Sequence, residues 1–287
     1  MNKFFSLKAG KLSSSEIIKK HCLICSYPAK KFTEKSGHII YKCINCGFGF
    51  TDSLNAQKGD YHRDETYIIE ERLFENIFLR RFKEITKFIK GGSVLDVGCS
   101  TGVMLSIFKR SGFDIKGVEI SKKAAQMCQN KGIDVIVGPF EKIKFGEKFD
   151  LIILNHTLEH LENPLQALEK AGRILKPKGY IMVDLPNFDS PVAKTLKSHW
   201  PHLLPDEHLW HFTPKAFTVL FKKMGYKILL IKKASGIWDF LKPHQELYDS
   251  LTGFKKRFIK NFLTALPSLI MTRMNKGSDL LVIARKK

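Results

Sequence analysis

The sequence predicts an α/β fold built on a doubly wound, mostly parallel sheet of seven strands. Short apolar runs alternate along the chain with segments whose apolar residues recur at the three- and four-residue spacing of amphipathic helices. Such alternation favours a parallel sheet that binds its ligands at the carboxyl ends of the strands. The predicted strands are 94–97, 115–118, 133–137, 149–154, 180–185, 226–231 and 280–284, and the helices between them are 103–111, 121–131, 164–175 and 214–224.

The charge of the chain is concentrated at its two ends. The 287 residues include 48 Lys and Arg against 28 Asp and Glu, a formal net charge of +20. Residues 1–90 carry +7, residues 91–221 only +2 and residues 222–287 +11. Basic ends of this kind suit nucleic acid, anionic lipid or phosphorylated metabolites. No apolar run reaches the roughly 18 residues of a membrane span, and we expect a cytoplasmic protein with reduced cysteines.

Four of the six cysteines form the pattern C-x2-C-x17-C-x2-C, which is typical of a zinc site. Each C-x-x-C makes a tight knuckle whose two sulfurs face one point, and two knuckles complete a tetrahedron. Four protein ligands leave no position for water, so the predicted zinc is structural; the alternative is four unrelated thiols. The ligands are Cys22, Cys25, Cys43 and Cys46, in a small zinc-ribbon-like module at residues 1–50.

The remaining chain divides into a helical connector at 51–90, a core at 91–232 and a basic extension with the last strand at 233–287. Within the extension, residues 254–271 have an apolar side and a basic side, and residues 254–287 carry a net charge of +8. A basic amphipathic helix can lie on an anionic membrane. It can equally pack on the core, as most amphipathic helices do.

A ligand site is indicated where the first core strand ends. The stretch VLDVGCSTG, residues 94–102, passes from a buried strand into small residues around one carboxylate, that of Asp96. Gly98, Ser100 and Gly102 let the backbone approach a ligand, and the helix that follows offers free N–H groups. Glu119 closes the next strand, where a carboxylate can accept ribose hydroxyls. Asp96 would repel a pyrophosphate but suits an amino group, which favours S-adenosylmethionine over a dinucleotide.

Residues 91–232 resemble the class I S-adenosylmethionine-dependent methyltransferases. The resemblance rests on VLDVGCSTG, on Glu119, on FDLIILNHTLEHLENP in the fourth strand and on RILKPKGYIMVDLPN before the fifth. It implies a Rossmann-like fold, S-adenosylmethionine as cofactor and Asn155 at the cofactor. The family often has an acid for the adenine amino group after the third strand, where this chain has Pro139, so we expect Phe140 beside the adenine, with Glu141 as the alternative. His160, in the same motif, is expected to be structural, with a catalytic role as the alternative.

A histidine-rich loop follows the fifth strand and is the predicted source of a general base. Methyl transfer depends mostly on positioning, but a hydroxyl or carbon acceptor must also lose a proton. We expect His208 to take it, with Glu207 as its orienting partner and His211 in reserve; otherwise these side chains only brace the loop. The loop carries His199, His202, Asp206, Glu207, His208 and His211.

The cysteine module and this loop are partly similar to the zinc-containing sugar C-methyltransferases. The similarity implies that Tyr61 or Tyr67 of this chain holds the acceptor. That similarity favours a small-molecule or glycan acceptor, such as a nucleotide sugar or lipid-linked saccharide in polysaccharide biosynthesis. The chain lacks the residue motifs of base methylation, so nucleic acid is disfavoured. An RNA methyltransferase and a non-catalytic binding protein remain as alternatives. No stable protein partner is implied.

Overall fold

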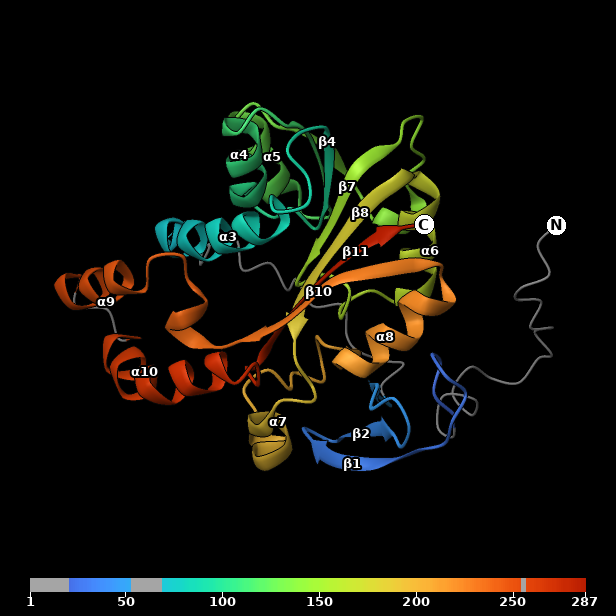
Figure 1. Ribbon diagram of the computed structural model, residues 1–287, viewed down its shortest axis with the longest axis vertical. Helices are drawn as coiled ribbons and strands as arrows, with labels where there is room; N and C mark the ends of the chain where they lie inside the picture. Colours follow the sequence, from blue (N-terminus) through green and yellow to red (C-terminus); the bar gives the residue numbers. More distant parts are fainter. Residues whose placement is uncertain (1–20, 53–68, 254–256) are drawn as a thin grey trace.

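The main sheet has the strand order β10-β11-β8-β7-β4-β5-β6 (Figure 1). The structure is a computed structural model that describes residues 21–52, 69–253 and 257–287. Strand β11 runs antiparallel to β10 and β8, and all other neighbouring strands are parallel. The predicted doubly wound sheet of seven strands is therefore confirmed. Its strands are β4 (Ser93–Val97), β5 (Asp114–Glu119), β6 (Asp134–Val137), β7 (Phe149–Asn155), β8 (Leu175–Pro186), β10 (Tyr226–Ala234) and β11 (Asp279–Lys286).

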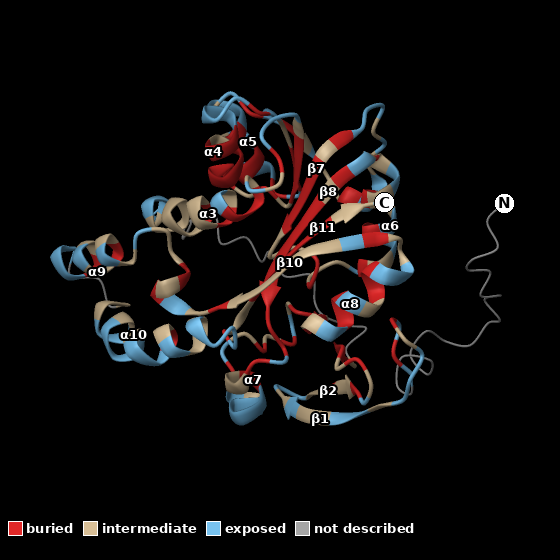
Figure 2. Cartoon of the chain, viewed as in Figure 1, coloured by how far each residue is buried: buried red, intermediate tan, exposed pale blue. Residues whose placement is uncertain are grey.

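Helices cover both faces of this sheet and enclose two apolar clusters. On one face, α3 (Glu71–Ile85), α4 (Val103–Arg110) and α5 (Lys122–Asn130) pack around a cluster that includes Phe108. On the other face, α6 (Pro164–Ile174) and α8 (Pro214–Lys223) pack around a cluster that includes Phe217. The buried strands run between the two layers (Figure 2).

Local sequence sets where several of these helices begin. The side chains of Ser121, Asn163 and Thr213 each accept a hydrogen bond from a backbone N–H in the first turn of the helix that follows. Residues of this type are preferred at that position because the first N–H groups of a helix lack partners within the helix. Pro164 and Pro214 stand at the next position, where a missing N–H costs nothing.

A second, smaller sheet joins the cysteine region to the core. Its order is β1-β2-β3-β9, with β1 (Ala29–Lys35), β2 (His38–Cys43) and β3 (Gly49–Thr51) from the N-terminal region. Its fourth strand, β9 (Trp210–His211), comes from the histidine-rich loop. Gly49 is required at this junction because a Cβ there would lie 2.4 Å from the ring of Phe188. The N-terminal module and the core are therefore built into one another.

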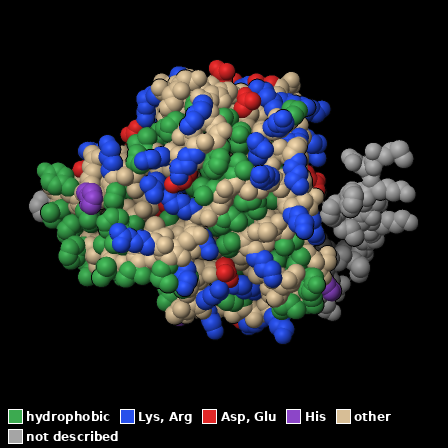
Figure 3. Space-filling view, viewed as in Figure 1, with side chains coloured by type: hydrophobic (Ala, Val, Ile, Leu, Met, Phe, Trp, Pro, Cys, Tyr) green, Lys and Arg blue, Asp and Glu red, His purple; other side chains and the backbone are tan. Residues whose placement is uncertain are grey.

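Between β10 and β11 the chain leaves the sheet and forms a helical lobe. A short 3-10 helix (Gly236–Asp239) leads into α9 (Pro243–Thr252) and α10 (Arg257–Arg273). The lobe projects from the edge of the sheet where β8 and β10 end, and hydrophobic side chains gather along it (Figure 3). Among the described residues, no helix is both long and apolar enough to cross a membrane.

A buried arginine ties α3 to the sheet and to this lobe. The Nε of Arg81 lies 2.5 Å from Oδ2 of Asp184 in β8, and its Nη1 pairs with Asp239 at the start of the lobe. All three side chains are buried. Charges in such surroundings are stable only when they are paired, so this cluster fixes the position of the lobe on the core.

Candidate functional site

The turn after β4 has the shape that its glycines predict. Gly98 and Gly102 have φ of +77°, and Ser100 has φ of +47°. A Cβ at Gly98 would lie 2.5 Å from Oγ1 of Thr157, and one at Gly102 would lie 2.9 Å from Sγ of Cys128. Backbone strain and lack of space both demand glycine at these two positions. The turn therefore presents its backbone closely packed at the carboxyl edge of the sheet.

Glu119, the predicted ribose acceptor, holds this turn against the end of β5. Its Oε2 accepts a hydrogen bond of 2.8 Å from the N–H of Ser100. Its Oε1 accepts bonds of 2.7 and 2.9 Å from the N–H groups of Ile120 and Ser121. The carboxylate thus lies directly beside the turn, where the predicted cofactor would bind.

Asp96 is a buried carboxylate beside the same turn. Burial, together with the nearby charge of Glu119, raises the pKa of Asp96 to about 7. Its Oδ1 has no hydrogen-bond partner among the described residues, and the same holds for Oγ1 of Thr101 and Oδ1 of Asn155. Buried polar atoms are rarely left unpaired. These three oxygens at one edge fit a ligand that brings donors, as the amino group of S-adenosylmethionine would.

Phe140, predicted to lie beside the adenine, stands in the short 3-10 helix Phe140–Lys142 after β6. This places it at the same edge of the sheet as Asp96 and Glu119. Its side chain is buried, its ring centroid is 6.0 Å from that of Phe145, and the Nζ of Lys170 lies 4.8 Å from its centroid. Its contact with adenine stays a prediction.

A group of histidines surrounds a buried carboxylate after β7. The Nδ1 of His156 lies 3.3 Å from Oε1 of Glu159. Burial opposes charge on both side chains, but their mutual attraction prevails and sets the pKa of Glu159 at about 2 and that of His156 at about 9. His160 and His208 complete the group, with ring centroids 4.7 Å apart. At neutral pH the group therefore holds an ion pair next to two further imidazoles.

Backbone carbonyls fix the orientation of these two imidazoles. The Nδ1 of His160 donates to the carbonyl of Glu207 at 3.0 Å, and that of His208 donates to the carbonyl of His202 at 2.8 Å. Because burial lowers the pKa of His208 to about 4, its ring is neutral and its Nε2 is an acceptor. Ligand atoms of Glu159, His160 and His208 lie within 4.8 Å of one another, a donor set that can also take a divalent metal.

The predicted catalytic residues thus lie in different surroundings. His208 joins the group around Glu159, and Glu207 contributes its backbone carbonyl to that group. His211 lies in β9, where its Nε2 is 3.3 Å from Oγ1 of Thr51 and burial lowers its pKa to about 3. The roles of these residues stay predictions, and Tyr61 and Tyr67 lie outside the described residues.

Sequence reasoning missed the position of His156 and Glu159. Both lie within four residues of the end of β7, the fourth core strand. Because ligands bind at the carboxyl ends of parallel strands, this position could have indicated that the two side chains belong to the site. Their pairing depends on a φ of +49° at His156, which turns the chain back on itself. Nothing in the local sequence indicates that conformation.

The four cysteines meet at one point, as their spacing predicts. The Sγ of Cys22 lies 3.5 Å from that of Cys46, and the Sγ of Cys25 lies 3.4 Å from that of Cys43. All four sulfurs lie within 4.8 Å of one another. Thiolates bound to one tetrahedral zinc at 2.3 Å are separated by roughly 3.8 Å, so the cluster fits that ion. The carbonyl of Cys46 also accepts a hydrogen bond of 2.7 Å from Thr213, the residue that caps α8.

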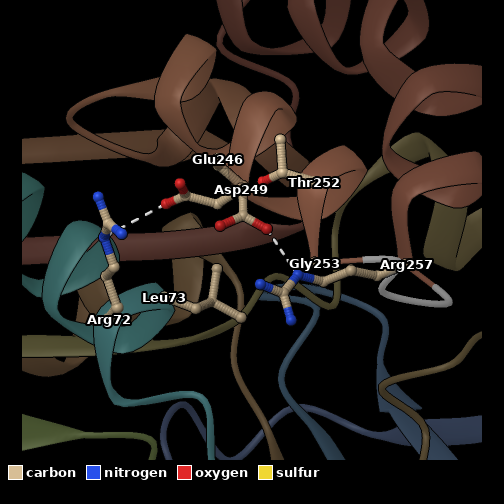
Figure 4. A pocket seen from close by; sticks show the side chains of 7 residues that line it. All are labelled: Arg72, Leu73, Glu246, Asp249, Thr252, Gly253 and Arg257. Atoms are coloured by element: carbon tan, nitrogen blue, oxygen red, sulfur yellow. Dashed lines mark hydrogen bonds and ion pairs between the residues drawn. The ribbon is translucent and has the colours of Figure 1, made fainter.

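Two pockets lie toward the lobe. One, of about 310 Å³, opens at the carboxyl ends of β8 and β10 and is mainly basic. The other, of about 270 Å³, lies between α3 and α9, and ion pairs of Arg72 with Asp249 and of Arg257 with Glu246 satisfy its charges (Figure 4). The basic pocket is lined by Asn187, Asp189, Pro191, Lys194, Lys233 and Lys276.

Comparison with known proteins identifies relatives of the core. A family described as a methyltransferase domain matches residues 67–231. An uncharacterised protein of Methanocaldococcus jannaschii is 34% identical over 157 residues, which cover 53% of this chain and 73% of that protein. A ubiquinone biosynthesis O-methyltransferase of Alkalilimnicola ehrlichii is 27% identical over 135 residues, covering 44% of this chain and 52% of that enzyme. The chain thus matches about half the length of that relative.

Solved structures share the fold. An S-adenosylmethionine-dependent methyltransferase from Archaeoglobus fulgidus superposes with a TM-score of 0.52 at 20% identity, covering 79% of this chain and all of that one. A plantazolicin methyltransferase in complex with SAH superposes with a TM-score of 0.54 at 17% identity, covering 80% of this chain and 91% of that one. At these identities the likeness concerns the fold.

We expect the affinity for S-adenosylmethionine to fall as the pH drops below about 7, by about tenfold per pH unit. The raised pKa of Asp96 means that its carboxyl holds a proton below that pH, and only the ionised form pairs with a cationic amino group. Asp96→Asn should weaken binding and flatten this dependence, whereas Asp114→Asn, on an exposed residue at the opposite edge, should change neither. Isothermal titration calorimetry above and below pH 7 measures the affinity for S-adenosylmethionine. A wild-type affinity that does not change with pH would contradict the prediction.

Proposed function

Since the chain belongs to the methyltransferase domain family, we propose that it methylates a small-molecule or glycan acceptor that carries a phosphate group. The family and the fold make it an S-adenosylmethionine-dependent methyltransferase. The turn after β4, with Asp96 and Glu119 beside it, is where the cofactor fits. The proposal concerns the acceptor. A nucleotide sugar and a lipid-linked saccharide both combine a sugar with a phosphate group, as the proposal requires.

The basic pocket is the observation that carries this proposal. It opens at the same edge of the sheet as the cofactor turn, at the end of β8, which stands two strands from β4. The pocket extends from β8 to β10, which stands four strands from β4. Neighbouring strands lie about 4.8 Å apart, so the pocket lies roughly 10 to 19 Å from the cofactor turn, a span that a phosphorylated saccharide can bridge. Lys194 pairs with Asp189 at 2.9 Å, but the ammonium groups of Lys233 and Lys276 have no carboxylate partner within the described parts of the chain. Such a pocket suits the oxygens of a phosphate.

Catalysis in this arrangement depends mainly on positioning. When bound, S-adenosylmethionine supplies an electrophilic methyl group, and the pocket lysines would hold the acceptor in line with it. If the acceptor is a hydroxyl, its proton needs a base. His208 is the favoured base because its ring is neutral and His202 fixes its tautomer. The carboxylate of Glu159 lies beside it and can stabilise the imidazolium that forms, against the opposing charge of His156.

A structural zinc at the four cysteines belongs to the same proposal. The module contacts the loop that carries His208 at several points. Strand β3 pairs with β9, and the Oγ1 of Thr51 in β3 donates to the carbonyl of His208 at 3.2 Å. The Nε2 of His38 lies 3.0 Å from Oδ1 of Asp206. Zinc would fix the module and through it the shape of the loop. Its role is structural because all four positions of the ion are filled by protein.

We expect one zinc ion per chain and loss of that ion in Cys22→Ser or Cys43→Ser, because each thiolate is one of four ligands. Elemental analysis and thermal unfolding measure the two effects, zinc content and stability. Cys128→Ser, at a buried cysteine outside the cluster, is the control and should keep its zinc. Zinc-free protein from reducing, zinc-replete cultures would contradict the assignment.

The acceptor is tested by methyl transfer from labelled S-adenosylmethionine to nucleotide sugars, lipid-linked saccharides and RNA. We expect turnover with a phosphorylated saccharide. The double variant Lys233→Ala/Lys276→Ala should raise its KM roughly tenfold or more, because it removes two charge-assisted hydrogen bonds. Cofactor affinity should not change. Lys222→Ala/Lys227→Ala, on exposed lysines away from the pocket, is the matched control. Turnover of RNA alone would refute the proposal.

The base is tested with that acceptor once it is found. His208→Ala should lower kcat by about a hundredfold to ten-thousandfold, while the affinity for S-adenosylmethionine stays within a few-fold. His199→Ala removes an exposed histidine of the same loop and should leave kcat unchanged. Steady-state kinetics on both variants decide the matter. Near-normal turnover in His208→Ala would show that the histidines only brace the loop.

A further inference from the structure

Helix α10 has the reverse of the usual distribution of side chains. Most of the residues that face the rest of the molecule are small or polar and recur at helical spacing, although Phe258, Leu269 and Met271 are half-buried as well. The small or polar ones are Asn261, Ala265, Ser268 and Thr272. The carbonyl of Ala265 accepts a hydrogen bond of 2.7 Å from Trp238, and Oγ1 of Thr272 accepts one of 3.0 Å from the N–H of Ser235. The helix approaches the chain at Gly236 so closely that a Cβ there would lie 2.6 Å from Oγ of Ser268. This close approach leaves space only for small side chains on that side of α10.

Five large apolar side chains of α10 are exposed to solvent instead. We call them the outer stripe; Ile259 is 68% exposed, Phe262 65% and Leu263 69%. Tyr248 and Leu251 of α9 are exposed as well, and Figures 2 and 3 show the exposed, hydrophobic lobe. A contiguous apolar surface of this kind marks a docking site. The outer stripe consists of Ile259, Phe262, Leu263, Leu266 and Ile270.

The charged side chains of α10 itself are all positive, and the two carboxylates of α9 are held in ion pairs. Residues 257–276 contain two Lys and two Arg but no Asp or Glu. Arg257 is bound within the lobe, to Glu246 at 2.6 Å and to Glu70. Lys260 and Arg273 are exposed and have no ion-pair partner in the described parts of the chain. Large apolar side chains flanked by cations complement the surface of an anionic bilayer. A second copy of the lobe would instead bring like charges together.

We propose that the outer stripe docks on an anionic lipid bilayer. The ion pair of Arg72 with Asp249 holds α9 to α3, and that of Arg257 with Glu246 holds α10 to α9 (Figure 4), so the lobe presents a fixed surface. Because β10 ends and β11 begins at the carboxyl edge of the sheet, docking brings the basic pocket toward the lipid headgroups. This orientation rests on the proposed function and favours a lipid-linked phosphate among its acceptors. The binding itself does not depend on the acceptor.

The experiment is co-sedimentation of the full chain with vesicles, without acceptor or cofactor. The vesicles consist of phosphatidylcholine alone or of phosphatidylcholine with phosphatidylglycerol. We expect binding to the anionic vesicles that weakens with salt, and little binding to the neutral ones. Phe262→Ser should weaken it roughly tenfold, since each exposed apolar side chain that enters the bilayer contributes this much. Lys260→Glu/Arg273→Glu should weaken it by a similar factor.

The control is Tyr27→Ser, which removes an aromatic side chain of comparable exposure, 53%, from the cysteine module. It should bind anionic vesicles as the wild type does. A thermal shift with S-adenosylmethionine confirms that each variant is folded. The proposal is overturned if the wild type does not bind anionic vesicles, or if Tyr27→Ser loses as much affinity as Phe262→Ser. It is also overturned if Phe262→Ser abolishes a dimer in analytical ultracentrifugation without affecting vesicle binding. Because the assay needs no acceptor, its result is separate from that of the methyl-transfer test.

Discussion

The pairing of β3 with β9 is the contact on which the arrangement of the candidate site depends. Gly49 pairs with His211 and Phe50 with Trp210, although the two strands lie far apart in the sequence. The ring of Phe48 stacks on that of Trp210 at 6.0 Å and meets that of Phe212 edge-on at 5.1 Å. This short ladder and its aromatic rings fix the end of the histidine-rich loop. The position of His208 beside Glu159 is a consequence, since His208 lies two residues before β9.

The main sheet could be predicted because its strands are buried on both faces and read as continuous apolar runs. The cofactor turn could be predicted because its glycines and Glu119 are close in sequence and their spacing is itself the signal. The strand β9 could not be predicted, since two residues show no periodicity and their partner is far along the chain. For that reason His211 reads as a candidate base in the sequence, although it forms part of a sheet. The cluster around Glu159 depends on the backbone turn at His156, which is equally hidden.

The helix α10 shows a different limit of sequence reasoning. Its periodicity correctly predicts an amphipathic helix, but periodicity does not say which side faces the protein. That choice is made by close approach: Gly236 and Trp238 fit only against small residues such as Ser268 and Ala265. The buried pairs of Arg81 with Asp184 and Asp239 then hold the start of the lobe in place. The side of α10 that faces the protein is therefore decided by packing and by buried charges, which involve residues far apart in the sequence and cannot be read from the composition of the helix.

The sheet shared between module and core also limits how this protein can diversify. A zinc-binding module on a flexible linker can be exchanged between enzymes as a cassette. Here the module takes its last strand from the core, and Thr213 joins the carbonyl of Cys46 to the first turn of α8. A chimera that replaces the cysteine module must therefore also replace the loop that ends in β9. The two segments are far apart in the sequence but in contact in the structure, so substitutions in either one are constrained by the other.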